Sequence, residues 1–292
     1  NLAPPASVIK SVELNNLPFH GFSGFRISGS KVIDDQITEV SPDIAVCDEC
    51  LAEMSSNPAR YNYPLINCTN CGPRFTIIRD LPYDRPATTM ADFEMCGKCR
   101  GEYNDISDRR FHAQPVACNE CGPSYILKSG NRTTRNVILI LEEIASLIES
   151  GRTVAVKGTG GYHLMCDALQ NDAVERLRRN KQRDLKPFAA MFPAISEIKK
   201  FCFVSREEEN ELLSWRRPVV LLSAKITLAE SVSSGLNTIG AMLPSMPFHY
   251  LMFRYLKTSA VVMTSGNLSE EPVITDDDEA AGKLEKVADA IV

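Results

Sequence analysis

The chain has 292 residues, enough for about two domains, and its 44% hydrophobic content is ordinary for a globular protein. No apolar run approaches the roughly 20 residues of a membrane-spanning helix, so we expect no membrane segment. The net charge of −5 argues against a protein that coats nucleic acid. Between Arg176 and Lys186, however, six basic residues accompany one acidic residue, which indicates a small anionic ligand more than a polyanion.

Residues 1–30 are patterned too weakly to form a core of their own. Residues 7–13 alternate as a strand does, residues 18–24 are typical of a turn, and residues 25–27 could form a second strand. Residues 31–46 link this segment to a region rich in cysteine, proline, glycine and asparagine, in which we expect little regular structure.

Four Cys-x-x-Cys motifs follow, and they contain eight of the ten cysteines. Two intervening residues let one tight turn direct two thiolates at the same ion, and four thiolates complete a closed, structural zinc site. We assign one zinc ion to the first two motifs and one to the last two, although a crossed pairing also satisfies the spacing. The ligand sets are Cys47, Cys50, Cys68 and Cys71 for one ion, and Cys96, Cys99, Cys118 and Cys121 for the other.

Residues 47–73 and 96–123 are interpreted as two copies of one unit within a zinc-binding domain of residues 31–130. In each copy an arginine followed by an aromatic residue precedes a Cys-x-x-Cys-Gly-Pro motif. These pairs are Arg60-Tyr61 and Arg110-Phe111. The glycine can adopt the positive φ that closes such a turn, and the proline fixes the exit of the chain.

A disulfide framework in a secreted protein is the alternative use of so many cysteines. Paired Cys-x-x-Cys motifs favour metal, and no basic and apolar leader precedes them in this sequence. We therefore expect a cytoplasmic protein in which Cys166 and Cys202, outside the motifs, are buried as small hydrophobic residues.

From about residue 135 the pattern changes to alternating helices and strands, which predicts an α/β sheet domain over residues 131–292. Residues 137–150 are expected to form an amphipathic helix that ends at Gly151. Further helix starts are expected at Asp172 with Glu175, at Ser205 with Glu208 as a capping box, and at Thr275 with Asp278. Strands are expected at residues 153–156, 219–222 and 261–263.

The first candidate ligand-binding segment of this domain is the glycine-rich loop of residues 157–163. Such a loop exposes backbone N–H groups to an anion, but the spacing lacks the complete Walker or dinucleotide pattern, so a flexible strand-to-helix turn is the alternative. Lys157, Tyr162 and His163 could reach the same pocket, although His163 is equally well interpreted as a packed or solvated imidazole.

The second candidate segment contains Lys181, Arg183 and Lys186. Pro187 disfavours a helical conformation at the residue before it, so the helix is expected to have ended there. If the chain is extended from Lys181, then Lys181 and Arg183 share a face and can bind one phosphate chain, the lysine as a point charge and the arginine as a fork. The alternative is a solvated helix end, where the helix dipole favours cations.

The third candidate segment is Thr264, Ser265, Gly266 and Asn267, after an apolar strand. Ligands of open α/β sheets bind beyond the carboxyl ends of strands, and short polar side chains there suit phosphate or carbonyl groups. A plain Asx-type turn is the alternative. The acidic run 276–278 could hold Mg²⁺, but the N-terminus of a helix explains it better.

Lys181-x-Arg183 together with Ser265-x-Asn267 resembles the paired K-x-R and S-x-N signature of YrdC-like domains, which make carbamoyl adenylates from ATP. Other stretches are more similar still to the hydrogenase maturation carbamoyltransferases of the HypF type. They are residues 157–158, 163–168, 186–189 and 265–272, with 67–75 and 109–115 in the zinc region. The resemblance covers about residues 40–292. It implies a small duplicated four-cysteine zinc-finger domain followed by a YrdC-like α/β domain with a twisted mixed sheet.

Proteins of that family are longer. They begin with an acylphosphatase-like domain that releases carbamate from carbamoyl phosphate, and they end with a carbamoyl-transferring domain. The resemblance implies that residues 1–30 are the end of the first of these, and that the YrdC-like domain of residues 131–292 is cut short at Val292. It also implies two structural zinc ions, with ATP and Mg²⁺ as substrate. Carbamate would attack the α-phosphate, and the carbamoyl group would pass to the C-terminal cysteine of a hydrogenase maturation partner.

The same resemblance assigns catalytic roles to Lys181 and Arg183 at the phosphates, and to Ser265 and Asn267 at the α-phosphate or carbamoyl group. Further nucleotide-binding residues would be Lys157, Tyr162, His163, Lys186 and Thr264. One alternative is a threonylcarbamoyl-adenylate synthase of tRNA modification, but those enzymes lack the zinc duplication. Another is a zinc-dependent nucleic-acid-binding module, for which the acidic residues within the motifs would be a poor surface.

Overall fold

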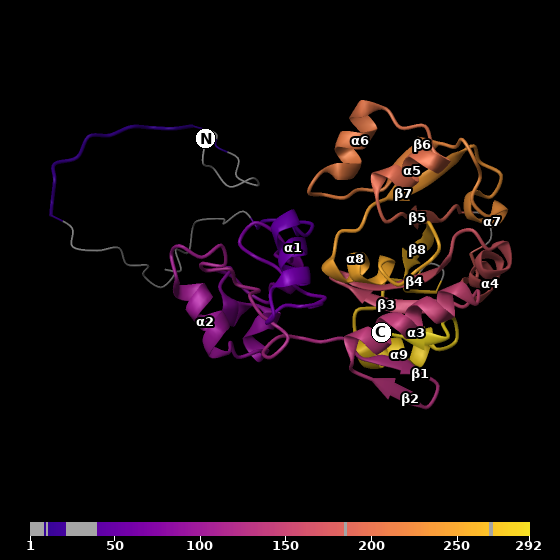
Figure 1. Cartoon of the computed structure of the whole chain (residues 1–292), viewed down its shortest axis with the longest axis horizontal. Helices are drawn as coiled ribbons and strands as arrows, with labels where there is room; N and C mark the ends of the chain where they lie inside the picture. Colours follow the sequence, from indigo (N-terminus) through magenta and orange to yellow (C-terminus); the bar gives the residue numbers. More distant parts are fainter. Residues whose placement is uncertain (1–8, 10, 22–39, 184–185, 269–270) are drawn as a thin grey trace.

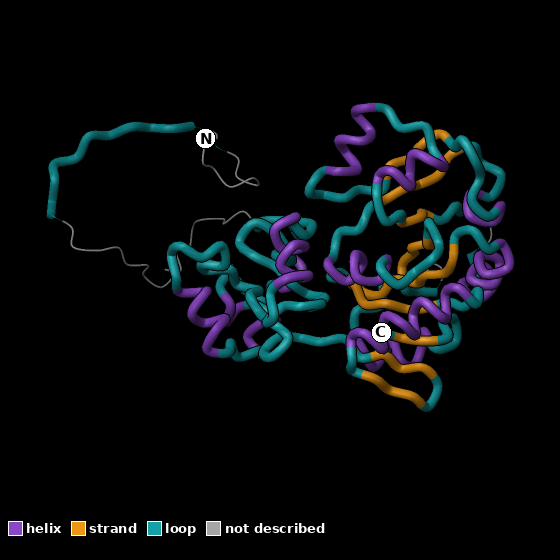
Figure 2. The backbone as a smooth tube through the Cα atoms, viewed as in Figure 1, coloured by secondary structure: helices purple, strands orange, loops and turns teal. Residues whose placement is uncertain are grey.

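The computed structural model describes most of the chain in two adjoining parts (Figure 1). The described residues are 9, 11–21, 40–183, 186–268 and 271–292. We call residues 40–126 the finger region and residues 127–292 the sheet domain. Figure 2 shows that the strands are gathered in the sheet domain, whereas the finger region consists of loops and short helices. Within the described residues, no helix is both long and apolar enough to cross a membrane.

The N-terminal segment forms no regular structure where it is described. Residue 9 and residues 11–21 are exposed and belong to no helix or strand. The strand predicted over residues 7–13 is therefore absent at its described positions, and the strand predicted over residues 25–27 lies outside the described residues.

The finger region contains little regular structure, as predicted. Its helices are α1 (Asp48–Ser56) and α2 (Gly97–Asn104), with the 3₁₀ turns η1 (Phe75–Ile77), η2 (Arg85–Ala87) and η3 (Thr89–Asp92). Helices α1 and α2 each begin directly after the first cysteine of a Cys-x-x-Cys motif, Cys47 and Cys96. The only buried residues of α1 are Cys50 and Met54, and α2 buries only Cys99. Neither helix presents the apolar stripe that would hold it in place by itself.

The sheet domain is built on a mixed sheet of nine strands in the order β2-β1-β9-β3-β4-β8-β5-β7-β6. The strands are β1 (Leu127–Ser129), β2 (Arg132–Thr134), β3 (Val154–Gly158), β4 (Gly161–Asp167), β5 (Ala189–Met191), β6 (Val220–Ser223), β7 (Thr238–Met242), β8 (Val261–Ser265) and β9 (Ala290–Ile291). The pairs β3–β9 and β5–β7 are parallel, and the other pairs are antiparallel. The predicted mixed-sheet α/β fold is thus confirmed, as are the three predicted strands.

Helices cover both faces of this sheet. They are α3 (Val137–Glu149), α4 (Asn171–Lys181), α5 (Ile195–Phe201), α6 (Arg206–Leu213), α7 (Glu230–Ser233), α8 (Pro247–Phe253) and α9 (Asp277–Leu284). Side chains of α3 and α8 share one core with alternate residues of the central strands, and α4 and α9 share the other. The first core continues into the finger region through Val46, Met54 and Ile66, so the two parts pack as neighbours.

Hydrogen bonds also fasten the finger region to the sheet domain, one of them from the Tyr125 hydroxyl to the Lys157 carbonyl at 2.8 Å. Ala45 N donates to the Trp215 carbonyl at 3.0 Å, and Val46 N donates to the Ser245 carbonyl at 2.9 Å. Arg254 Nη2 donates to a serine hydroxyl at the end of α1, also at 2.9 Å.

The helix starts test the predicted caps. The Ser205–Glu208 capping box is confirmed, with both of its hydrogen bonds formed. The cap at Asp172 is wrong, because α4 begins earlier, with Gln170 as its N-cap and Asp172 inside the first turn, where the helix dipole favours a carboxylate. The cap at Thr275 is also wrong. Asp276 caps α9 by accepting from two backbone N–H groups, which supports the structural interpretation of the acidic run over Mg²⁺ binding.

Candidate functional site

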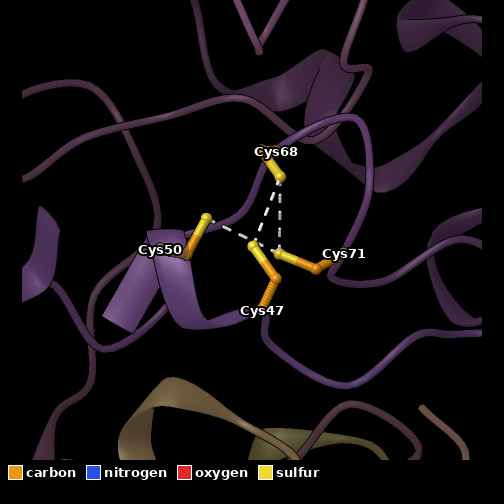
Figure 3. A group of neighbouring side chains, drawn as sticks. All are labelled: Cys47, Cys50, Cys68 and Cys71. Carbon is orange, nitrogen blue, oxygen red and sulfur yellow. Dashed lines mark hydrogen bonds between the residues drawn. The ribbon is translucent and has the colours of Figure 1, made fainter. Parts of the chain in front are cut away.

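Two sets of four cysteines converge in the finger region. We call Cys47, Cys50, Cys68 and Cys71 the first cluster, and Cys96, Cys99, Cys118 and Cys121 the second cluster. Within each cluster the sulfur atoms all lie within 4.8 Å of one another. Figure 3 shows the sulfur atoms of the first cluster gathered around a common centre. The motifs are thus grouped in sequence order, and the crossed pairing is not adopted.

The sulfur spacing fits a tetrahedral zinc ion. In the first cluster the Sγ–Sγ distances are 3.8 Å for Cys47–Cys68, 3.7 Å for Cys68–Cys71 and 3.6 Å for Cys71–Cys50. Four thiolates placed about 2.3 Å from one ion at tetrahedral angles lie about 3.8 Å apart.

The second cluster has the same dimensions. Its Cys96–Cys118 and Cys118–Cys121 Sγ–Sγ distances are both 3.8 Å, and all ten cysteines are free thiols. These separations are far longer than a disulfide bond, so the disulfide framework does not match the structure. With four sulfur ligands each, both sites are closed, and a bound zinc ion there would hold the fold together and leave no position for substrate.

A second constellation forms at the end of β8, where three residues predicted as catalytic meet. Lys181 is the last residue of α4, is 2% exposed, and reaches across to the strand end. Its Nζ donates to the Ser265 carbonyl, the Asn267 carbonyl and Asn267 Oδ1, each at 2.6 Å. Ser265 Oγ donates to the same Asn267 Oδ1 at 2.7 Å. We call Lys181, Ser265 and Asn267 the lysine–asparagine cluster.

The pKa of Lys181 differs from that of an ordinary surface lysine. Burial, together with the smaller effect of the neighbouring Arg183 guanidinium, lowers the pKa of Lys181 to about 8. The ammonium gives all three of its N–H groups to oxygen acceptors, so in this arrangement it fixes the position of Asn267 and supplies positive charge at the carboxyl end of β8.

Arg183 lies beside this cluster and contacts a fourth predicted residue. Its Nη1 lies 3.4 Å from Thr264 Oγ1, its Nη2 donates to the Pro187 carbonyl at 2.9 Å, and its guanidinium stacks on the Phe188 ring, 5.1 Å from the centroid. Burial lowers the pKa of Arg183. The Lys186 side chain, in contrast, is exposed, and the hydrogen bonds of this residue are made by its carbonyl.

Arg178, which the sequence does not single out, holds this segment in place. Its Nη1 donates to the carbonyls of Arg183 and Lys186, both at 3.0 Å, and its guanidinium lies 4.4 Å from the Phe188 ring centroid. Arg178 is one of the six basic residues between Arg176 and Lys186, and the sequence of such a run does not indicate which side chain is buried.

His163 faces the same strand end from the neighbouring strand. It pairs with Ser265 in the antiparallel register of β4 and β8, and burial lowers its pKa, which favours the neutral imidazole. His163 therefore lies beside Ser265 on the neighbouring strand.

The glycine-rich segment has a different structure from the one predicted. Residues 157–163 form neither a phosphate loop nor a strand-to-helix turn, because β3 and β4 pair directly as a hairpin with Gly158 opposite Gly161. Gly161 has φ +130°, and a Cβ there would lie 2.7 Å from Val273 Cγ1 and 2.8 Å from the Ile274 carbonyl. The glycine is thus required by the close approach of another backbone segment.

Lys157 and Tyr162 are consequently directed at Asp277, away from the lysine–asparagine cluster. Lys157 Nζ forms an ion pair with the Asp277 carboxylate, and the Tyr162 hydroxyl donates to it at 2.9 Å. Although burial opposes it, these hydrogen bonds hold the pKa of Asp277 below its ordinary value. In the sequence, Asp277 stands out only as part of the acidic run at the helix start.

A cavity of about 940 Å³ lies between the finger region and the sheet domain. Tyr63, Phe93 and Tyr125 line it from the finger region, and Lys157 and Tyr162 line it from the sheet domain. None of the lysine–asparagine cluster borders this cavity. Of the two groups of predicted site residues, only Lys157 and Tyr162 line this cavity.

Two family profiles match the sequence. The HypF finger profile matches residues 46–78 and 95–127. The Sua5–YciO–YrdC profile, described as telomere recombination, matches residues 146–292. Both profiles thus fall on the parts seen in the structure.

Two HypF relatives cover the chain more completely than either profile. Carbamoyltransferase HypF of Rhodobacter capsulatus is 42% identical over 99% of this chain and 39% of its own length. Probable carbamoyltransferase HypF of Methanocaldococcus jannaschii is 42% identical over 99% of this chain and 38% of its own length. Threonylcarbamoyl-AMP synthase of Hydrogenovibrio crunogenus is 32% identical over 47% of this chain and 78% of its own length.

Among solved structures, full-length HypF in its phosphate- and nucleotide-bound form superimposes with a TM-score of 0.84 and 49% sequence identity. It matches 88% of this chain and 34% of that chain, so this chain spans well under half the length of its HypF relatives. The HypF relatives match the finger region and the sheet domain together, and the chain therefore belongs to the HypF carbamoyltransferase family.

Proposed function

We propose that the sheet domain binds Mg·ATP at the lysine–asparagine cluster and forms carbamoyl adenylate, as one part of a carbamoyltransferase. The observation that carries this proposal is the convergence of Lys181 with Ser265 and Asn267, which lie 84 and 86 residues away in sequence. A polar cluster with a buried cation, at the carboxyl end of a strand, suits a phosphate chain. The named relatives support the reaction class, since one is a threonylcarbamoyl-AMP synthase and a solved HypF carries phosphate and nucleotide.

In the proposed reaction a carbamate oxygen attacks the α-phosphorus of ATP, and the bond to the β-phosphate breaks to release pyrophosphate. Lys181 and Arg183 would lower the cost of bringing two anions together, because both are cations in a partly desolvated setting. Lys181 would also hold the Asn267 amide, whose Nδ2 donates to the Glu271 carbonyl, in one orientation. The carbamate itself is the nucleophile in this reaction, so the cluster would act by positioning and charge stabilisation.

In the whole protein, we propose, the carbamate comes from carbamoyl phosphate, and the carbamoyl group passes to the C-terminal cysteine of a hydrogenase maturation partner in the cytoplasm. The two cysteine clusters would each hold a structural zinc ion. These assignments rest on the family, because the chain spans 39% of the Rhodobacter relative.

Calorimetric titration of the zinc-loaded chain with Mg·ATP tests the proposal. We expect one saturable site in the wild-type chain, lost in Lys181→Met and Asn267→Ala, and retained in Lys257→Met, where an exposed lysine pairs with Glu149. Binding that survives both cluster variants would refute the placement of the nucleotide.

A second candidate function is threonylcarbamoyl adenylate synthesis, favoured by the 32% identity to the Hydrogenovibrio enzyme. The HypF fingers argue for the first candidate. Adding threonine and bicarbonate with ATP, in place of carbamoyl phosphate, separates the two, since only the second function would then give a threonylcarbamoyl adenylate.

A further inference from the structure

The two repeats of the finger region exchange their arginines. Arg110, in the second repeat, forms an ion pair with Glu53 on α1 of the first repeat at 2.5 Å. Its Nε also donates to the Asn67 carbonyl at 3.2 Å. Glu53 follows Cys50 on the same helix and Asn67 directly precedes Cys68, so one buried arginine ties together both motifs of the first cluster.

Arg60, at the equivalent position of the first repeat, makes the reciprocal contacts. It forms an ion pair with Glu102 on α2, and its Nε donates to the Ala117 carbonyl at 3.1 Å. Its Nη2 also lies 3.4 Å from Cys99 Sγ. Arg60 therefore ties together the two motifs of the second cluster and contacts one of its sulfur atoms directly.

Main-chain hydrogen bonds also join the two repeats at equivalent positions. Thr69 N donates to the Arg109 carbonyl, and at the equivalent positions Asn119 N donates to the Ala59 carbonyl, both at 3.2 Å. The exchange is therefore a property of the two repeats as a pair and involves main chain as well as side chains.

Burial makes these arginines sensitive to their partners. The Arg60 side chain is 0% exposed and the Arg110 side chain 3% exposed. A buried guanidinium is stable only while its hydrogen bonds and its carboxylate partner compensate for the lost hydration. Loss of the carboxylate or of a hydrogen-bond acceptor therefore disturbs both cysteine motifs that the arginine contacts. Exposed pairs such as Arg100–Glu94 carry no such penalty.

We propose that Arg60 and Arg110 are positioning residues for the zinc site of the opposite repeat. Each cluster then owes the alignment of its two motifs to an arginine that lies, in sequence, between the two motifs of the other cluster. A substitution of either arginine therefore weakens first the zinc site of the opposite repeat. The two zinc sites form one interlocked unit and are not two independent fingers.

Site-resolved thiol alkylation of the zinc-loaded full chain tests this inference. A zinc-bound thiolate reacts slowly, so mass spectrometry of the modified cysteines reports which site opens. Arg110→Lys keeps the charge but loses the fork, and it should raise the alkylation rate of the first cluster by about tenfold relative to that of the second. Arg60→Lys should do the reverse. Arg100→Lys, on the exposed face of α2, is the matched control and should change neither rate.

Glu53→Gln and Glu102→Gln keep the side-chain shape and provide a second, milder pair in case an arginine variant unfolds the region. Glu53 and Glu102 are the partners of the two arginines, so Glu53→Gln should open the first cluster and Glu102→Gln the second. The inference is overturned if an arginine variant opens the cluster of its own repeat, or if both clusters open at equal rates in the arginine and glutamine variants alike.

Discussion

The protonation state of Lys181 should control nucleotide binding at the lysine–asparagine cluster. The lysine is buried, its pKa is lowered to about 8, and its three N–H groups serve three oxygen acceptors. A neutral amine has only two N–H groups to give, so deprotonation leaves one buried acceptor without a donor and removes the positive charge from the strand end. Both changes oppose the binding of an anion.

The sign and size of the effect follow from this pKa. A bound phosphate chain favours the charged lysine and raises its pKa in the complex, so the nucleotide binds the protonated form. With a pKa of about 8, the charged fraction is roughly 0.9 at pH 7 and roughly 0.1 at pH 9. If only the charged form binds, the affinity for Mg·ATP falls about tenfold over this range, which is about 1.4 kcal/mol.

Calorimetry at pH 7, 8 and 9, in two buffers with different ionisation heats, measures both the affinity and the protons exchanged. At pH 9 close to one proton should be taken up for each nucleotide bound by the wild-type chain, and Lys181→Met, in which saturable binding is lost, should show no such uptake. Lys257→Met should keep the wild-type profile. An affinity that is flat between pH 7 and 9 would refute the role given to this lysine, whereas no binding at any pH would refute the proposed function itself.

Three further outcomes are expected. Gly266→Ala should destabilise the chain by roughly 1–3 kcal/mol in thermal unfolding, because the added Cβ would lie 2.6 Å from Tyr162 Cβ. Gly282→Ala is the control: its added Cβ meets open space, so this variant should be neutral or slightly stabilising. Chelation of zinc should abolish hydrogen-exchange protection in α1 and α2 and spare β4 and β8, because α1 and α2 bury almost nothing but cysteine. Retained protection in the two helices would contradict a structural role for the metal. Arg109→Ala should speed alkylation of the first cluster roughly fivefold, because Arg109 Nη2 lies 2.7 Å from Cys50 Sγ. The second cluster should be unaffected, because the equivalent residue of the first repeat is Ala59. An alkylation rate equal to that of the wild-type chain would show that this contact does not protect the thiolate.

The features that were predicted correctly are those with a local cause. A Cys-x-x-Cys turn needs only its own residues to aim two thiolates, and the sequence-order pairing of motifs keeps the connecting loop short. The Ser205–Glu208 capping box is likewise formed by side chains and backbone within one turn. The caps at Asp172 and Thr275 failed by one or two residues, because several polar residues nearby can cap equally well and packing of the helix selects among them.

The hairpin at residues 157–163 was missed because its cause is not local. Two glycines between apolar strands suit a phosphate loop as well as a hairpin, and the choice depends on where the second strand pairs. Here Gly161 is pressed against residues 273–275, which come more than a hundred positions later. The exchange of Arg60 and Arg110 is non-local in the same way, because the duplicated arginines are visible in the sequence but their partners are not.

The Lys-x-Arg spacing alone left two geometries open, an extended segment and the end of a helix. An extended segment would place Lys181 and Arg183 on one face, whereas Lys181 ends α4 and Gln182 adopts the left-handed conformation at φ 53° and ψ 46°. A left-handed residue after a helix reverses the chain, so the two cations are brought together by a helix C-cap. Lys181 then points back to the end of β8 while Arg183 reaches Thr264 on the same strand. The one residue between the two cations is therefore the turn that lets both of them serve a single strand end.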